Sequence, residues 1–200
     1  MFSLFAKPWK ASDPKSEKFI GIGAFNMLKS SVYEAIGTHY AIRMRPDDDM
    51  KLGKLVKKHG FRQELLQGKD LLCVEWYASA SEMVRGLEKN SFAGIDYSLI
   101  TVLFAAISQI TLFIWPFFAL IFTEGATQIV NTAIVLTTIF MYLGSSTVSG
   151  TRRYYSFAFP IAAALFTFII LNSTVKTLVN NGISWRGTHY PLSELKANKV

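Results

Sequence analysis

The stretch LITVLFAAISQITLFIWPFFALIF, residues 99–122, decides the fold class, because none of its 24 residues carries a charge. A helix needs about 20 consecutive apolar residues to cross a hydrocarbon core of roughly 30 Å. Two further uncharged runs follow, at 125–151 and 154–175. We therefore expect an integral membrane protein with three membrane helices, at about Leu99–Phe122, Ala126–Gly144 and Tyr155–Val175.

Charged residues gather before the first of these runs. Of the 35 Asp, Glu, Lys and Arg residues, 26 lie in residues 1–95, and these include 15 of the 21 basic ones. Because Lys and Arg mark the cytoplasmic side of a membrane, residues 1–95 and the loop with Arg152 and Arg153 are expected in the cytoplasm. A bacterial inner membrane is the expected location.

The tail from residue 176 disagrees with this topology. After three crossings it should lie outside, yet its charged residues are mostly basic: Lys176, Arg186, Lys196 and Lys199 against Glu194. Either the charge rule fails for the tail, or one apolar segment does not cross the membrane completely.

Composition also narrows the function classes. A net charge of +7 on such a chain suggests an anionic membrane surface rather than a nucleic-acid partner. The single Cys73 cannot form an internal disulfide, which suits a reducing compartment. The three apolar runs contain no ionisable Asp, Glu, Lys or Arg that would mark a transport pathway, so a transporter is disfavoured.

Residues 1–78 predict a small α+β region. We expect a buried strand with a glycine bend at 18–28, a helix at Asp49–His59 ended by Gly60, and two extended runs at 64–77 around a turn at Gly68. Ser31 and Glu34 match a helix-capping box, with Gly37 as the terminator.

Residues 79–97 predict an amphipathic helix at the membrane interface. Ser79 and Glu82 form a second capping box, and Met83, Val84 and Leu87 make an apolar stripe. The expected organisation is then this helix, three membrane helices over 98–175, and a polar tail over 176–200.

Three consecutive aspartates, Asp47, Asp48 and Asp49, begin the lysine-rich helix. Acidic residues stabilise a helix N-terminus, but one capping aspartate meets that need, and the repulsion among three calls for nearby cations such as Arg43 and Arg45. Asp47-x-Asp49 is also a weak match to a metal-binding pair. The three histidines lack metal-ligand spacing and are expected to be structural: His39, His59 and His189.

Four segments in order carry a family resemblance: GIGAFNMLKSSVYEAIG, DDDMKLGKLVKKHG, EMVRGLEKNSFAG and, after the apolar runs, GISWRGTHYPLSELK. Together they resemble the C-terminal half of membrane-bound family 2 glycosyltransferases, especially ceramide glucosyltransferase and its bacterial relatives. The resemblance covers the chain from about Phe19 onward. It implies that residues 1–78 are part of a GT-A-type α/β catalytic domain.

The resemblance also implies roles for individual residues. Asp49 matches the catalytic base, Asp48 its polar support, and Asp47 remains a helix cap. Gly21, Gly23 and Asn26 match the acceptor side, although turn geometry explains the glycines equally well. Lys89 stands where the family has an arginine of a Q-x-x-R-W motif, whose glutamine and tryptophan are missing here. A surface lysine at the lipid interface is the alternative.

Trp185 and Arg186 match a tail motif of the family. They would cover the acceptor or contact phosphate if the tail returns to the cytoplasmic face, and they would anchor the tail in the interface if it does not.

The expected reaction is sugar transfer from a nucleotide-sugar donor to a membrane lipid acceptor, with inversion. The family binds its donor through an N-terminal α/β half with a divalent metal, Mg²⁺ or Mn²⁺, whose ligands we do not find in this chain. The expectation is therefore a fragment or half of a split enzyme, inactive without that half. The competing interpretation is a non-catalytic membrane protein, a degenerate fragment or an assembly subunit, in which the aspartates only cap a helix.

Overall fold

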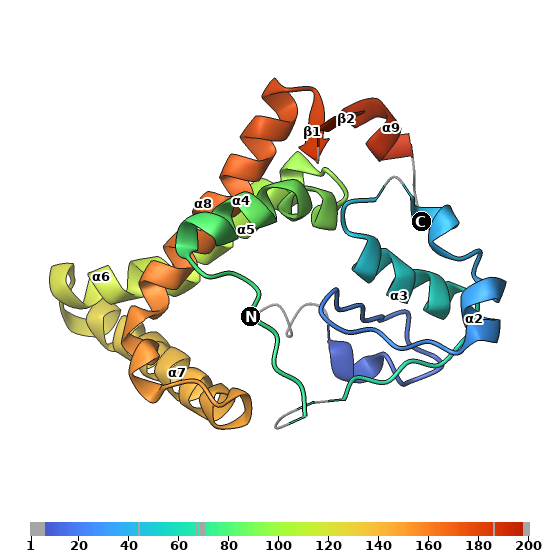
Figure 1. The fold of residues 1–200 in the computed structure, drawn as a ribbon. Coiled ribbons are helices and arrows are strands. Elements are labelled where there is room, and N and C mark those ends of the chain that lie inside the picture. Colours follow the sequence, from blue (N-terminus) through green and yellow to red (C-terminus); the bar gives the residue numbers. More distant parts are fainter. Residues whose placement is uncertain (1–6, 44, 67, 69–70, 186, 198–200) are drawn as a thin grey trace. The chain divides into compact units, whose positions relative to one another are not determined.

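The computed structural model describes residues 7–43, 45–66, 68, 71–185 and 187–197 (Figure 1). It is mostly helical and forms two compact units. The polar unit contains the described residues up to Tyr97 and from Lys176 onward, and the apolar unit contains Ser98–Val175. A GT-A-type sheet is not seen in the described residues, whose strands form one two-stranded sheet.

The first part of the polar unit is built from short helices. In chain order they are η1 (Pro8–Lys10), α2 (Ser30–Ala35), η2 (His39–Ile42), α3 (Asp48–Lys58), α4 (Ala80–Ser91) and η3 (Ala93–Ile95). The predicted lysine-rich helix is confirmed as α3, and Gly60 follows it with a left-handed φ of 79°. Gly37, at φ 82°, likewise follows α2 as predicted.

A small hydrophobic core holds α2, η2 and α3 together. Its buried members are Ile36, Ile42, Leu52, Leu55 and Val56. Leu52, Leu55 and Val56 recur at helical spacing, and the face of α3 that they share is the buried one. Each such side chain contributes about 1.5–3 kcal/mol by leaving water.

Two predicted extended segments are not strands. Residues 18–28 form a loop with a turn in which the Phe25 amide donates to the Ile22 carbonyl at 3.2 Å. The described residues of 64–77 are also irregular, although the predicted turn at Gly68 is present. An apolar alternating run becomes a strand only where another strand supplies its backbone hydrogen bonds, and among the described residues no other strand lies beside these segments.

The two predicted capping boxes differ in outcome. The prediction at Ser31 is wrong, because α2 already begins at Ser30 with Lys29 at its N-cap and no side-chain cap. The prediction at Ser79 is confirmed, since its hydroxyl accepts the Glu82 amide at 3.1 Å. The Glu82 carboxylate in turn accepts the Ala78 amide at 2.9 Å.

Ser79→Ala is expected to lower the free energy of unfolding by about 1 kcal/mol, because the Glu82 amide loses its acceptor. Denaturant unfolding of the purified chain in detergent measures this change. Ser31→Ala is the matched control and should have a smaller effect, and equal losses from both variants would contradict the observed cap.

The apolar unit is entirely helical in its regular structure. It contains α5 (Leu99–Gln109), the π-helical turn η4 (Ile110–Ile114), α6 (Trp115–Phe122), α7 (Gly125–Ser149), η5 (Arg153–Ala158) and most of α8 (Phe159–Val179). Three helical segments are long and apolar enough to cross a membrane: Leu99–Phe122, Gly125–Thr147 and Arg153–Val179. By length and composition, the prediction of three membrane helices is confirmed.

Local chemistry accounts for the details of these helices. The wide turn η4 ends at Ile114, two residues before Pro116, whose ring has no N–H and collides with the carbonyl four residues earlier in a regular helix. Threonine hydroxyls bond to carbonyls four residues back along α7 and α8, so they need no water; examples are Thr132, Thr137, Thr138, Thr167 and Thr174.

The tail has more structure than the sequence indicated. After α8, strands β1 (Gly182–Trp185) and β2 (Thr188–Pro191) pair antiparallel, with Ser184 opposite His189. A last helix, α9 (Leu192–Ala197), follows and buries Leu195. The hairpin and α9 belong to the polar unit.

Candidate functional site

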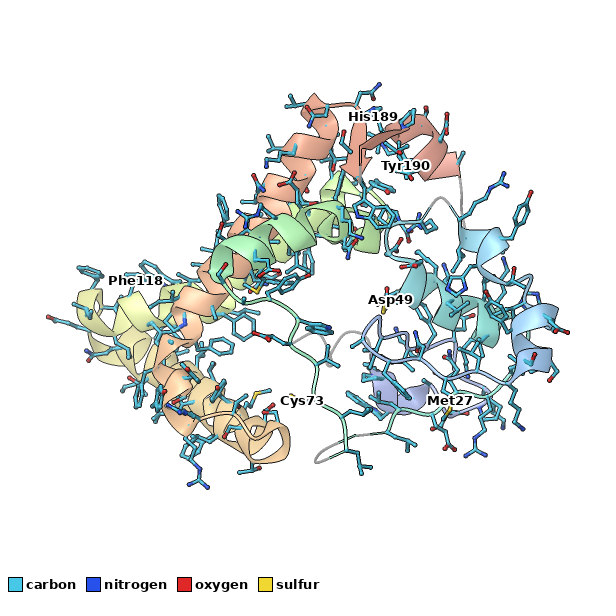
Figure 2. The ribbon with its side chains drawn as sticks, viewed as in Figure 1. Met27, Asp49, Cys73, Phe118, His189 and Tyr190 are labelled. Carbon is cyan, nitrogen blue, oxygen red and sulfur yellow. The ribbon has the colours of Figure 1, made fainter. Side chains whose placement is uncertain are left out.

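Asp49 lies in the first turn of α3 against the glycine loop of residues 20–23. A Cβ on Gly23 would lie 3.0 Å from the Asp49 carboxylate oxygen Oδ2, and one on Gly21 would collide with the Asp49 backbone carbonyl. Gly21 is therefore required by close approach to the Asp49 backbone, whereas a Cβ on Gly23 would need only a small shift of the Asp49 side chain. The other oxygen, Oδ1, accepts the Met50 amide at 2.8 Å. Figure 2 labels Asp49 at the start of α3.

Gln63 holds this loop on the helix. Its side-chain amide donates to the carbonyls of Ile20, at 3.2 Å, and Gly53, at 2.9 Å. Its side-chain oxygen accepts the Ile20 amide at 3.2 Å. The Ile20 carbonyl also approaches Gly53 closely. A Cβ at this position would collide with it, so the contact requires a glycine. The position of the glycine loop is thus set by hydrogen bonds from the Gln63 side chain to the backbone and by the close approach of Gly53 to Ile20.

The remaining predicted residues of this region are exposed. Asp48 lies on the solvent side of the first turn of α3, and Asn26 lies beyond the turn of the glycine loop. The structure brings Gly21 and Gly23 to Asp49. The Asp48 and Asn26 roles remain predictions.

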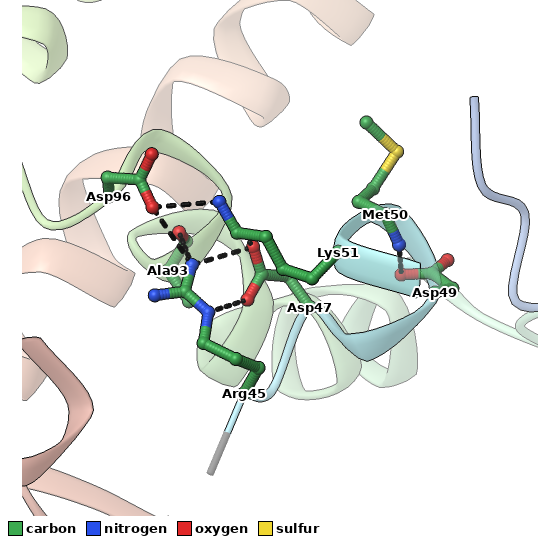
Figure 3. Close-up of polar contacts among 7 residues, drawn as sticks. All are labelled: Arg45, Asp47, Asp49, Met50, Lys51, Ala93 and Asp96. Atoms are coloured by element: carbon green, nitrogen blue, oxygen red, sulfur yellow. Dashed lines mark hydrogen bonds and ion pairs between the residues drawn. The ribbon is translucent and has the colours of Figure 1, made fainter. Parts of the chain in front are cut away.

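Asp47 does not cap the helix as expected. It occupies the N-cap position, but its side chain makes no capping bond. Instead it forms a two-pronged ion pair with Arg45, from Nε to Oδ1 at 2.8 Å and from Nη2 to Oδ2 at 2.9 Å (Figure 3). Both side chains are buried, with exposures of 2% for Arg45 and 5% for Asp47. A buried carboxylate gains more from a guanidinium fork than from one amide.

The pair belongs to a larger cluster that the sequence did not predict. Asp96 accepts hydrogen bonds from Arg45 at 3.0 Å and from Lys51 at 2.8 Å, while Lys51 lies 3.7 Å from Asp47. Arg45 also donates to the Ala93 carbonyl at 3.2 Å. Lys51 is therefore buried, although it lies outside the apolar face of α3. In the sequence, Asp96 is set apart only by its position, as the last charged residue before the first apolar run.

The electrostatics of the cluster favour its charged forms. Burial alone would lower the pKa of Arg45, but the hydrogen bonds and charge of Asp47 outweigh it and raise that pKa. Burial alone would raise the pKa of Asp96, but the hydrogen bond and charge of Lys51, helped by Arg45, lower it. The contribution of Asp96 to stability is present above its unfolded pKa and is lost as the pH falls through the lower folded value.

Tyr97 lies next to Asp96 in this cluster, and the backbone of both residues is strained. Asp96 and Tyr97 both have left-handed φ angles, 52° and 57°, in which residues other than glycine are uncommon. The Tyr97 ring packs edge-on against Phe92 at 5.3 Å, and Arg45 lies 5.8 Å from its centre. Its hydroxyl is buried with no hydrogen-bond partner among the described residues. Burial raises the pKa of Tyr97 to about 12.

Tyr97→Phe is expected to leave the chain as stable or to stabilise it by about 1 kcal/mol at neutral pH, because it removes a buried hydroxyl without a described partner. In the native chain the raised pKa contributes stability that is present below the unfolded pKa near 10 and is lost as the pH rises toward about 12. Unfolding titrations at neutral and alkaline pH measure both effects. A loss of more than 1 kcal/mol at neutral pH would reveal a bond to the hydroxyl.

A second group of predicted residues meets at an open cleft of about 360 Å³ in the polar unit. The Lys89 ammonium lies 4.2 Å from the centre of the Trp185 ring, a cation–π contact between α4 and β1. Arg85, Gly86 and Lys176 also line this cleft. Arg186 lies outside the described residues. Lys89 and Trp185 were thus predicted separately, and the structure brings them together.

The residues present do not suit a divalent metal ion. Asp47 is held by Arg45, and Figure 3 shows the Asp49 carboxylate turned away from that pair. The described part of the chain contains no group of three or more His, Cys, Asp and Glu residues that could hold an ion. The histidines have other contacts: His39 with Tyr33, His59 with the Leu55 carbonyl, and His189 with Ser184.

Comparison with known proteins gives no relative. No family model, no curated protein and no solved structure matches the chain. The case for a function rests on the residues themselves, on the order of the four motif segments and on the way the polar unit brings parts of them together.

Proposed function

We propose that the chain is the acceptor-side and membrane portion of an inverting glycosyltransferase, which moves a sugar from a nucleotide-sugar donor to a lipid alcohol. A donor-binding α/β half supplied elsewhere, with its Mg²⁺ or Mn²⁺, would complete the enzyme. The cytoplasmic face of a bacterial inner membrane is the proposed place of reaction.

The observation that carries the proposal is the contact between the glycine loop and Asp49. GIG, at residues 21–23, and DDD, at residues 47–49, come from different motif segments, yet Gly21 and Gly23 both lie against Asp49. The Gln63 hydrogen bonds hold this loop on α3, so the Asp49 carboxylate has a defined place beside it. A general base must be fixed in position to accept the proton of an attacking hydroxyl.

The chemistry asked of Asp49 is proton removal. A lipid hydroxyl is a weak nucleophile until a carboxylate accepts its proton as the oxygen attacks the anomeric carbon. The bond from that carbon to the donor phosphate breaks at the same time, and the nucleoside diphosphate leaves. One base is enough for inversion. Oδ1 of Asp49 accepts the Met50 amide, which orients the carboxylate and leaves Oδ2 beside Gly23.

Lys89 and Trp185 would serve the substrates at the cleft. An ammonium held over an indole ring has a defined place, and it offers a cation to a phosphate group. Lysine acts there as a point charge rather than as the two-pronged donor that an arginine would be. We assign Lys89 to phosphate contact and Trp185 to positioning Lys89, with Arg186 beside it in sequence.

Transfer of labelled sugar to lipid tests the proposal directly. Native membranes with the gene intact, deleted and restored would be incubated with a panel of radiolabelled nucleotide sugars, and the organic-soluble label counted. We expect one nucleotide sugar whose lipid product disappears on deletion and returns on restoration. Equal lipid labelling in all three membranes with every donor would refute the proposal.

One observation favours the competing function, a non-catalytic membrane subunit. The Asp49 carboxylate bonds to the amide of its own neighbour, Met50, as an acidic residue at any helix start can. In that case the glycines serve only close packing. The deletion experiment separates the two, because a subunit would alter the assembly of another protein without a missing glycolipid.

A further inference from the structure

The tail after α8 makes specific contacts with α4, the helix expected at the membrane interface. Lys176, in the last turn of α8, pairs with Glu88 of α4 at 2.6 Å. Lys89, the next residue of α4, lies over Trp185 of β1 at 4.2 Å. Both contacts lie inside the polar unit, which contains the described residues on each side of the apolar unit.

Further packing joins the tail to the start of α3. A small cavity of about 40 Å³ is bounded by Arg45 and Pro46 from before α3, and by Ile183, Tyr190 and Leu195 from the tail. Leu195 is only 1% exposed, so α9 is packed rather than free in solvent. The tail therefore takes part in the folded polar unit through apolar as well as charged side chains.

These contacts restrict how the chain passes through a membrane. A hydrocarbon core of roughly 30 Å separates the two aqueous faces, far more than the reach of an ion pair or a cation–π contact. Residues up to Tyr97 and residues from Lys176 onward can touch only if they lie on the same face. The intervening 98–175 must then cross an even number of times, although it contains three helical segments of sufficient length.

We infer that the tail lies on the same side of the membrane as residues 7–97, so that only two of the three apolar helical segments cross completely. The basic character of the tail agrees with this, because residues 1–95 and the tail are both rich in Lys and Arg. This inference does not depend on the proposed enzymatic function.

Side-specific labelling tests the inference. In a Cys73→Ser background, single cysteines would replace Lys15 and Ser193, which are both exposed. A membrane-impermeant maleimide would be added to sealed inside-out and right-side-out vesicles. We expect both cysteines to react in the same vesicle orientation and to be protected in the other. Reaction of the two cysteines in opposite orientations would overturn the inference.

Zero-length cross-linking of the unmodified chain gives an independent test. A water-soluble carbodiimide joins a carboxylate and an amine that are in contact, and it should produce a peptide pair linked through Glu88 and Lys176, identified by mass spectrometry. Glu88→Gln is the matched control and should abolish that linked pair. The peptide that contains Arg62 and Glu64 serves as a recovery control. If membranes give this peptide in normal yield but never the linked Glu88–Lys176 pair, the inference is contradicted.

Discussion

Arg45→Met is expected to lower the free energy of unfolding by about 3–5 kcal/mol, because it leaves a buried carboxylate without its main partner. Among the described cations, Asp47 would keep Lys51 alone, at 3.7 Å, in place of two hydrogen bonds shorter than 3.0 Å. Methionine matches the length of the arginine stem, so the loss measures charge and hydrogen bonding more than packing volume. Urea unfolding in detergent, followed by tryptophan fluorescence, provides the measurement.

Two controls isolate the buried pair. Arg62 forms an ion pair with Glu64 at 2.8 Å, but both side chains are more than half exposed. Arg62→Met should therefore change stability by only about 0–1 kcal/mol. The double variant Arg45→Met with Asp47→Leu removes both buried charges, and it should recover part of the loss. Equal effects of Arg45→Met and Arg62→Met would show that the cluster is not buried.

The parts of the fold that the sequence predicts are those with local causes. The uncharged run at 99–122 predicts a membrane helix because length and polarity alone decide that question. Ser79 and Glu82 predict a helix start because their hydrogen bonds span three residues. The structure has a helical segment of sufficient length and polarity over Leu99–Phe122, and it has the capped helix start at Ser79.

The wrong predictions concern features with distant causes. Residues 18–28 have a strand-like pattern, yet a strand also needs a neighbour, and this segment instead packs its glycines on α3. Lys51 falls outside the apolar face of α3, which favours exposure, but Asp96 forty-five residues later supplies the charge that buries it. The sequence could not pair Lys51 with Asp96 because no local rule connects them.

The candidate site shows the same division. Asp49 could be singled out from its place at a helix start and from the motif order. The contact between Gly23 and Asp49 and the contact between Lys89 and Trp185 required the folded chain. Asp47 was misassigned as a cap because helix-start rules consider only backbone amides, whereas Arg45 offers a stronger donor two residues away.

Asp49→Asn is expected to reduce sugar transfer to lipid by about 10²–10⁴-fold, the usual contribution of a general base. Asparagine preserves the size of the side chain, and its oxygen can still accept the Met50 amide. It cannot take the proton of an attacking hydroxyl. The loss should therefore appear in the maximal rate, with little change in the apparent KM for the nucleotide sugar. Initial rates in membranes with equal amounts of each variant measure it.

Asp48→Asn is the matched control, because it removes one negative charge from the same helix turn at an exposed position. If Asp49 is the base, the loss of transfer activity in Asp49→Asn should exceed the loss in Asp48→Asn by at least about tenfold. A purely electrostatic or capping role would give the two variants similar losses. Stability separates the interpretations further: a capping role changes the free energy of unfolding by about 1 kcal/mol or less and leaves turnover intact. Full transfer activity in Asp49→Asn would therefore show that Asp49 is not the base. This conclusion would hold even if the deletion experiment had already shown that the glycolipid requires the chain.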